Sequence, residues 1–303
     1  MTPLSRNIFE NYQTRKTKKQ KTAFIALLKQ HFPEMQVQTG SFPRCRNLII
    51  GDVETAKVVF TAHYDTCARL LFPNFIAPKN PLLCVAYSIL ICLPIFLGVW
   101  LVNLLMNLVT DSYWLHYWVS LVTCFGLLGL MIFGPANKHT ANDNTSGVIV
   151  LCELLEVLPE PLRKKAAFVF FDHEETGLVG SALFRSKYKK QMQEKLLINF
   201  DCVSDGDTIM LALSKAARKD FGELADRCFP ATEDKSILLT RAEKIYFPSD
   251  QLGFPVSIAV AALKMKPILG YYMDKIHTAR DREFDQKNLK LLCESSLRLL
   301  QKL

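Results

Sequence analysis

Along most of the chain, hydrophobic and polar positions follow the pattern of strands that alternate with helices. Short apolar runs, typical of buried strands, occupy four segments: 47–52, 56–63, 166–175 and 196–201. Apolar residues at helical spacing mark four others: 11–31, 147–157, 180–193 and 286–303. Such alternation predicts parallel strands covered by helices on both faces. The predicted fold is therefore α/β, a three-layer αβα sandwich with a central mixed, mostly parallel sheet.

The middle of the chain departs from this pattern. No Asp, Glu, Lys or Arg occurs from Pro81 to Thr110, and a second uncharged run extends from Ser112 to Asn137. Each run is long enough to cross a bilayer core, which needs ~20 residues. Aromatic residues gather where the runs approach their short connection, as at a membrane interface: Trp100, Tyr113, Trp114, Tyr117 and Trp118. These features favour a transmembrane helical hairpin, with spans at about 82–108 and 113–134, over a hairpin buried in a soluble domain.

The hairpin predicts a discontinuous domain of residues 1–80 and 138–303 with residues 81–137 inserted. Arg69 and Lys79 precede the first span and Lys138 follows the second, whereas the connection holds Asp111 but no Lys or Arg. Because positive residues favour the cytoplasmic side, we expect an integral membrane protein with the domain and both termini in the cytoplasm. An even number of spans also leaves both parts of the domain on one side.

Composition and charge further limit the classes of protein to which the chain can belong. A hydrophobic content of 50% excludes a disordered chain. The net charge is +8, and the densest basic cluster is Arg15, Lys16, Lys18, Lys19 and Lys21. A solvated helix face is the simplest interpretation of that cluster, with attraction to anionic lipid headgroups as the alternative. There is no nucleic-acid-binding motif, so no nucleic-acid partner is expected. The nine scattered cysteines form no CxxC pair, which fits a reducing compartment.

Metal-competent side chains follow several of the apolar segments. In chain order they are His63, Asp65, Asp143, Glu174, Glu175, Asp201, His277 and Asp281. Most lie at predicted carboxyl ends of strands, where ligand sites gather in open α/β sheets. Each has an ordinary explanation when it is taken alone; Asp143, for example, could cap the next helix. Adjacent carboxylates at the end of a buried strand are nevertheless costly without a compensating cation, so the combination favours a metal site.

Five segments, in this order, resemble the motif series of metallopeptidase family 28, the di-zinc aminopeptidases: HYDT, ANDNTSG, FFDHEETGLVGS, NFD and IHT. The resemblance covers nearly the whole chain except the hairpin. It implies a zinc aminopeptidase-like fold and a discontinuous zinc peptidase domain. It also implies an exopeptidase that hydrolyses N-terminal residues from peptide substrates.

The resemblance further implies a role for each site residue. One zinc would be held by His63, Asp143 and Asp201, and the second by Asp143, Glu175 and His277. Glu174 would be the general base, Asp65 would orient His63, and Asp281 would support the site from outside the ligand set. Two metals about 3.5–4 Å apart can activate one water. This ligand set suits Zn²⁺, although Mn²⁺ or Co²⁺ would also bind.

Two features depart from the family pattern. Ile276 stands where relatives often carry an aromatic residue, which makes the nearby Tyr271 and Tyr272 the candidates for substrate contact. The segment between His63 and Asp143 is also far longer than an ordinary loop, so the predicted membrane lies beside the site and substrate would arrive near the bilayer surface.

Two alternatives to the peptidase interpretation stay open. One is a glutaminyl-cyclase-like acyl transfer with a single zinc, and the other is a non-catalytic membrane scaffold with a peptidase fold. The presence of every implied ligand together with Glu174 favours the two-metal peptidase. Nothing in the sequence predicts an oligomeric state.

Overall fold

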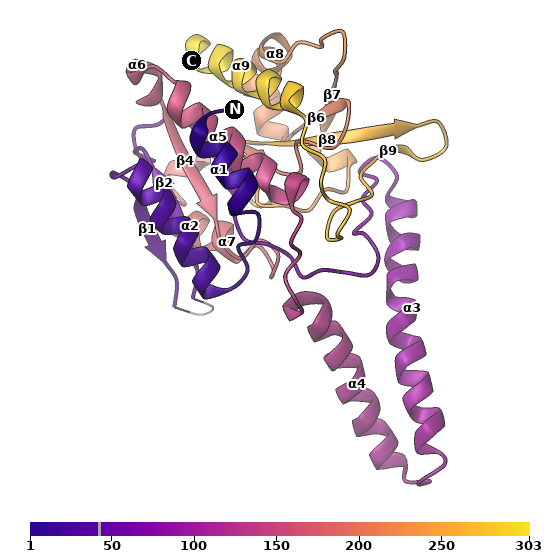
Figure 1. Cartoon of the computed structure of the whole chain (residues 1–303). Helices are drawn as coiled ribbons and strands as arrows, with labels where there is room; N and C mark the ends of the chain where they lie inside the picture. Colours follow the sequence, from indigo (N-terminus) through magenta and orange to yellow (C-terminus); the bar gives the residue numbers. More distant parts are fainter. Residues whose placement is uncertain (42–43) are drawn as a thin grey trace.

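The computed structural model describes residues 1–41 and 44–303, and these build one large sheet with helices around it (Figure 1). The described strands follow the order β1-β2-β4-β3-β5-β8-β6-β7, and β9 pairs with β8. Their bounds are β1 Gln36–Thr39, β2 Arg46–Ile50, β3 Val58–His63, β4 Ala166–Phe171, β5 Leu196–Phe200, β6 Thr208–Leu213, β7 Ser236–Arg241, β8 Ser257–Lys266 and β9 Gly270–Tyr272.

The sheet is mixed, as expected, but it is not mostly parallel. The central strands β4, β3, β5 and β8 run parallel to one another, and so do β6 and β7. The other four of the eight described pairings are antiparallel. Short links such as those between β1 and β2 and between β8 and β9 reverse the chain directly, whereas parallel neighbours need a crossover. The parallel arrangement that the strand alternation predicted therefore holds for the four central strands and for the β6–β7 pair.

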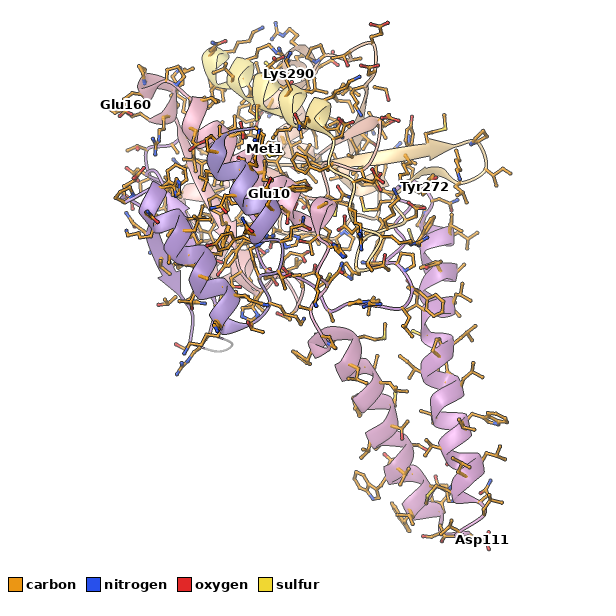
Figure 2. All side chains as sticks on the ribbon, viewed as in Figure 1. Met1, Glu10, Asp111, Glu160, Tyr272 and Lys290 are labelled. Carbon is orange, nitrogen blue, oxygen red and sulfur yellow. The ribbon has the colours of Figure 1, made fainter. Side chains whose placement is uncertain are left out.

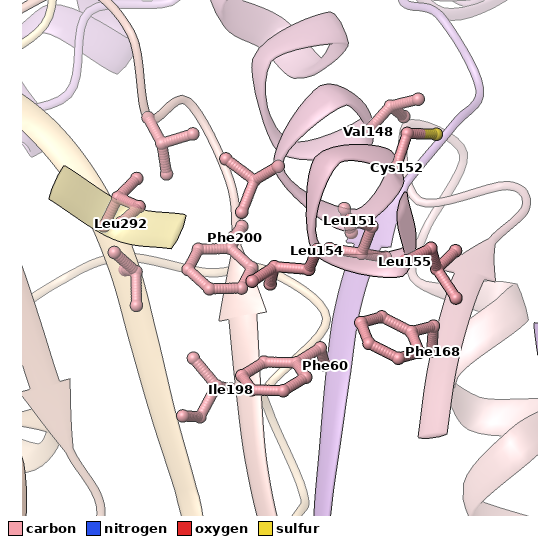
Figure 3. Packing of buried hydrophobic residues seen from close by; sticks show 14 of the residues in the cluster. Phe60, Val148, Leu151, Cys152, Leu154, Leu155, Phe168, Ile198, Phe200 and Leu292 are labelled. Atoms are coloured by element: carbon pink, nitrogen blue, oxygen red, sulfur yellow. The ribbon is translucent and has the colours of Figure 1, made fainter. Parts of the chain in front are cut away.

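Helices cover both faces of the sheet unequally. Their bounds are α1 Pro3–Asn11, α2 Lys18–His31, α3 Pro81–Met106, α4 Tyr113–Phe133, α5 Gly147–Val157, α6 Glu160–Arg163, α7 Val179–Lys187, α8 Lys215–Cys228 and α9 Gln286–Lys302. The largest hydrophobic cluster joins one face of the sheet to α1, α2, α5, α8 and α9, and α7 packs on the other face. Phe60, Phe168 and Phe200 from adjacent strands lie beneath α5 (Figure 3).

The N-terminal region holds two helices, and the single helix predicted from residue 11 is wrong. Thr17 begins α2 with a capping box, because its hydroxyl accepts from the Gln20 backbone and the Gln20 side chain accepts from the Thr17 backbone. Residues between Tyr12 and Lys16 therefore form a link rather than a helical turn. This link passes over the carboxyl end of β3, which matters for the site described below.

Helices α3 and α4 project from the domain as a pair that turns near Asp111 (Figures 1 and 2). Both are long and apolar enough to cross a membrane, and in the two helices together only Cys84 and Ile95 are buried. Asn103 of α3 donates to the Ser120 hydroxyl of α4 at 2.7 Å, and His116 lies 2.9 Å from the Asn103 side-chain oxygen. The helix bounds lie close to the two expected spans, while the division into a domain and an insertion stays a prediction.

Candidate metal centre

The candidate residues meet at one edge of the sheet because of where their strands end. Strand β3 ends at His63, Asp201 directly follows β5, and the segment with Glu174 and Glu175 follows β4. These three strands are adjacent and parallel, so their carboxyl ends lie side by side. Asp143 comes from segment Ala141–Ser146 before α5, and the loop after β9 supplies His277.

The side chains form two clusters that share Asp143. Nε2 of His63 lies 3.2 Å from Oδ1 of Asp143 and 3.4 Å from Oδ1 of Asp201. Nε2 of His277 lies 3.0 Å from Oδ2 of Asp143 and 3.3 Å from Oε2 of Glu175. Each oxygen of the Asp143 carboxylate thus faces a different histidine. The second cluster also brings the Cys67 thiol within 4.8 Å of the other candidate ligand atoms, a residue that the sequence did not single out.

The chemistry of this centre fits divalent cations. Oδ1 of Asp201 and Oε1 of Glu175 are buried and have no hydrogen-bond partner among the described residues. Unpaired buried carboxylate oxygens are costly unless a cation binds them. Burial raises the pKa of Glu175 to about 8 in the metal-free chain. Imidazole nitrogens and carboxylate oxygens are ligands that zinc accepts, so the residues present fit two such ions.

Asp65 links His63 to the segment that carries the two glutamates. Its Oδ1 and Oδ2 accept the backbone N–H groups of Glu174 and Glu175 at 2.9 and 3.3 Å. Nδ1 of His63 lies 3.6 Å from Oδ1 of Asp65 and 3.3 Å from its backbone carbonyl oxygen. Burial alone would raise the pKa of Asp65, but its contacts with His63 and the Glu174 backbone hold it at about 2. Asp65 is therefore a charged anchor for the glutamate segment.

Asp281 supports the opposite side of the centre. Its carboxylate accepts the backbone N–H groups of Asn142 and Asp143 at 2.8 and 3.0 Å. The side-chain oxygen of Asn142 in turn accepts the backbone N–H groups of Ser204 and Asp205, just beyond β5. The backbone that carries Asp143 is thus fixed to two other segments of the site.

The backbone around the centre holds three non-glycine residues in the left-handed region. His173, Cys202 and His277 have φ angles of 59°, 57° and 63°. Such conformations are unfavourable for L-residues and concentrate at functional sites, where the surrounding structure maintains them. Each lies beside or within the carboxylate and histidine set.

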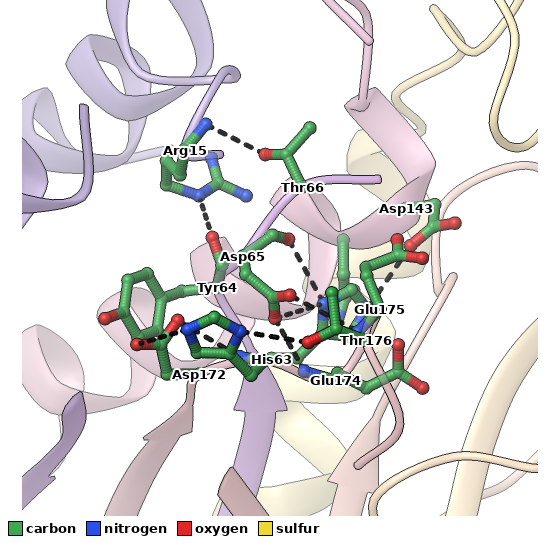
Figure 4. Close-up of polar contacts among 12 residues, drawn as sticks. Arg15, His63, Tyr64, Asp65, Thr66, Asp143, Asp172, Glu174, Glu175 and Thr176 are labelled. Carbon is green, nitrogen blue, oxygen red and sulfur yellow. Dashed lines mark hydrogen bonds and ion pairs between the residues drawn. The ribbon is translucent and has the colours of Figure 1, made fainter. Parts of the chain in front are cut away.

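Two members of the N-terminal basic cluster are buried, so a solvated helix face is wrong for them. Arg15 is fully buried in the link before α2, where its Nε donates to the Tyr64 carbonyl oxygen at 2.5 Å (Figure 4). Its Nη1 donates to the Thr145 hydroxyl at 3.2 Å. Lys21 forms a buried ion pair with Asp172, which directly follows β4. The sequence pattern missed both because only the tertiary fold brings this link and the first turns of α2 next to the strand ends.

Segment 249–251 supplies further site residues whose role the sequence did not reveal. The Ser249 hydroxyl donates to Oδ2 of Asp201 at 2.5 Å and accepts from the Asn199 amide at 2.9 Å. Asp250 is fully buried, and neither of its carboxylate oxygens has a hydrogen-bond partner in the described part of the chain. Burial raises the pKa of Asp250 to about 7. A short acidic and polar run in an irregular region gave no periodic signal.

The two tyrosines predicted to contact substrate lie on β9. The Tyr272 ring is 4% exposed and stacks on Phe75 with centroids 5.8 Å apart. Tyr271 packs against the hydrophobic cluster that contains Met273 and Ile276, with the Lys79 ammonium 5.8 Å from its ring centroid. Tyr272 thus holds a packed position near the start of α3, and substrate contact by either tyrosine stays a prediction.

The sheet, the ends of its central strands and the two side-chain clusters that share Asp143 are together typical of a metallopeptidase fold. Residues 126–295 match Peptidase family M28. The match covers more than half of the chain, so the protein belongs to this family. No curated protein matches the chain.

Solved structures share the fold at low sequence identity. A Zn-dependent exopeptidase from Parabacteroides distasonis is 13% identical with a TM-score of 0.58, over 98% of this chain and 96% of that one. The LapA aminopeptidase of Legionella pneumophila is 13% identical with a TM-score of 0.56, over 98% and 69%. A glutaminyl cyclase of Porphyromonas gingivalis is 15% identical with a TM-score of 0.56, over 99% and 95%.

Proposed function

We propose that this protein is a membrane-anchored, metal-dependent aminopeptidase. The observation that carries the proposal is the Asp143 carboxylate, whose two oxygens face His63 on one side and His277 on the other. One zinc would be held by His63, Asp143 and Asp201, and a second by Asp143, Glu175 and His277. Bound there, the pair of cations would lower the pKa of a shared water and polarise the scissile carbonyl.

Glu174 is the proposed general base. Its carboxylate belongs to a group with His63 and Glu175 whose candidate ligand atoms lie within 4.8 Å of one another. Burial raises the pKa of Glu174 well above its usual range in the metal-free chain. Glu174 would take up a proton at its carboxylate from the attacking water and release it to the leaving amine. Asp65 keeps this glutamate in place by accepting its backbone N–H.

Helices α3 and α4 are the proposed membrane anchor. Large apolar side chains cover their outer surfaces, including Leu97, Phe125 and Phe133, each more than half exposed. A soluble protein rarely exposes an apolar surface of this extent. Arg69, Lys79 and Lys138 flank the helices on the domain side, which favours a domain in the cytoplasm. The proposed site would then receive peptides close to the bilayer surface.

Glutaminyl cyclisation is the second candidate. It is supported by the shared fold of the Porphyromonas gingivalis glutaminyl cyclase, but that reaction needs a single zinc. The His63, Asp143 and Asp201 cluster argues for a second cation, because a lone zinc at His277 would leave Oδ1 of the buried Asp201 with no hydrogen bond and only a 3.4 Å contact with His63. The metal content of the purified protein separates these two candidates, whereas bound metal without turnover of any peptide would favour the scaffold alternative.

The deciding experiment uses the full chain purified in detergent. It would be incubated with peptides that carry a free, an acetylated or a glutaminyl N-terminus, with and without a chelator, and the products identified by mass spectrometry. We expect stepwise loss of N-terminal residues from free peptides only, with two metal ions per chain and no activity after chelation. Release of C-terminal residues, or pyroglutamate formation without hydrolysis, would refute the aminopeptidase proposal.

A further inference from the structure

A hollow of about 560 Å³ on the domain surface is lined by cationic side chains. The basic residues and the histidine around it are Lys16, Lys18, Lys21, Arg44, Arg46 and His173. They come from the end of the link before α2 and the start of α2, from the beginning of β2 and the residues before it, and from the segment after β4. Three stretches far apart in the sequence thus place positive charge around one space, which points to an anionic occupant.

Most of this charge has no acidic partner. Among the described residues, the hollow contains one ion pair between a lysine or arginine and a carboxylate, that of Lys21 with the buried Asp172. Arg46 donates to the Thr22 hydroxyl at 3.0 Å. The first turn of α2 holds Lys18 but no acidic residue, although a cation there is unfavourable against the helix dipole. An anion in the hollow would provide a partner for the unpaired cations and would offset the unfavourable position of Lys18 at the start of α2.

The hollow adjoins the end of the apolar hairpin. Nζ of Lys16 donates to the backbone carbonyl oxygen of Ile132, in the last turn of α4, at 2.8 Å. The beginning of α2 lies on the side of the domain from which α3 and α4 project (Figures 1 and 2). Where α4 leaves the bilayer, the hollow would therefore lie at the depth of the lipid headgroups.

We propose that this hollow is a docking surface for the headgroups of anionic phospholipids, an inference that rests on the proposed membrane anchor. Clusters of Lys and Arg immediately beside a membrane-spanning helix attract anionic lipids. The hydrogen bond from Lys16 to Ile132 favours a lipid over a soluble anion, because it holds the cations next to α4, around which lipids would pack. The partner has a phosphate that accepts hydrogen bonds from ammonium and guanidinium groups.

The test uses the full chain reconstituted in phosphatidylcholine vesicles, with spin-labelled phosphatidylglycerol and phosphatidylcholine as probes. Electron paramagnetic resonance gives the ratio of the association constants of the two lipids. We expect a several-fold preference for phosphatidylglycerol that decreases at high salt. In the triple variant Lys16→Gln, Lys18→Gln, Arg44→Gln, the ratio should fall close to one.

A matched control removes the same charge far from the hairpin. Its substitutions are Lys219→Gln, Lys290→Gln and Lys302→Gln, on helices α8 and α9 at the end of the domain opposite the hairpin (Figure 1). They should leave the ratio unchanged. An equal ratio for both probes in the unmodified protein would overturn the proposal. So would equal losses in the two triple variants, or displacement of the lipid by inorganic phosphate at an ionic strength where chloride has no effect.

A separate measurement shows whether the proposed membrane anchor inserts into the bilayer. Resistance to carbonate extraction reports whether α3 and α4 insert, and it should be the same for all three proteins. If the hairpin does not insert, the proposed anchor is wrong. Co-sedimentation of the same proteins with phosphatidylglycerol vesicles then tests whether the hollow binds anionic headgroups. Binding that the first triple variant alone loses would support the docking surface, whereas no binding would refute it.

Discussion

The carboxylate of Asp281 holds the backbone of Asp143, accepting its N–H at 3.0 Å while it also accepts the N–H of Asn142 at 2.8 Å. Asp143 is the residue whose carboxylate reaches both histidines. The two aspartates are far apart in the sequence, yet together they fix the point at which the two clusters of the site meet. The position of the shared ligand therefore depends on a residue outside the ligand set.

Replacement of Asp281 tests this dependence. In Asp281→Asn the amide nitrogen would face one of the two backbone N–H groups, so either Asn142 or Asp143 would lose its acceptor and the backbone that carries Asp143 would be held less firmly. Loss of such an outer contact typically weakens metal binding by about 10- to 100-fold, which competition with a chelator would measure. Asp207→Asn, at a side chain that is 86% exposed, is the control. Unchanged metal affinity in Asp281→Asn would show that the contact is dispensable.

Glu174→Gln should remove peptide hydrolysis while metal stays bound. The amide is nearly the same size but cannot accept the proton, so we expect kcat to fall by a factor of about 10² to 10⁴. Steady-state kinetics and elemental analysis of the same sample measure the two properties. Glu194→Gln, at an exposed position beside β5, should change neither. Loss of metal in Glu174→Gln would instead assign Glu174 to the ligand set.

Metal binding should release protons and weaken as the pH falls. Burial raises the pKa of Glu175 from its usual 4.5 to about 8 in the metal-free chain, so this carboxyl carries a proton at neutral pH. A cation must displace that proton, and its affinity therefore increases as the pH rises toward 8. Calorimetric titration in buffers of different ionisation enthalpy counts the released protons. Affinity that is constant from pH 6 to 8 would contradict this expectation.

Arg15 should contribute strongly to stability, unlike its exposed neighbours. Arg15→Met would remove the donors to the Tyr64 carbonyl oxygen and to Thr145, and would leave the buried Tyr64 carbonyl oxygen unpaired. We expect a loss of about 2–4 kcal/mol in the free energy of unfolding, measured by denaturant titration of the metal-free protein. Lys19→Met, an exposed position in α2, should change it by less than about 0.5 kcal/mol. Similar values for both variants would count against a structural role for Arg15.

Removal of the outer part of the hairpin should give a soluble protein that retains its metal. The contacts near the domain need to stay, because Cys84 bonds to the Ala77 backbone and Asn137 donates to the Thr278 carbonyl oxygen at 3.0 Å. A flexible linker in place of residues 89–133 keeps both contacts. Size-exclusion chromatography without detergent and elemental analysis would check the result. A soluble protein without metal would show that the site requires the hairpin.

Periodic patterns predicted the central elements well, because their side chains are buried in a regular way. Helix α5 has the predicted bounds of 147–157, and the central strands β3, β4 and β5 lie within their predicted segments. Strands β6 and β7 and helix α8 gave no clear signal. In β7 most residues are only partly buried, so the contrast between apolar and polar positions that reveals a strand is weak there.

The sequence by itself determined the candidate metal centre and the apolar hairpin. Adjacent carboxylates at the end of a buried strand are costly without a cation, the motif series indicated the histidines, and long uncharged runs are visible without knowledge of the fold. Only the tertiary structure decided that Arg15 is buried, that Ser249 donates to Asp201, and that Lys16 reaches the end of α4. Those relationships join residues that are far apart along the chain. Only the folded backbone, and no local pattern, brings them within hydrogen-bonding distance.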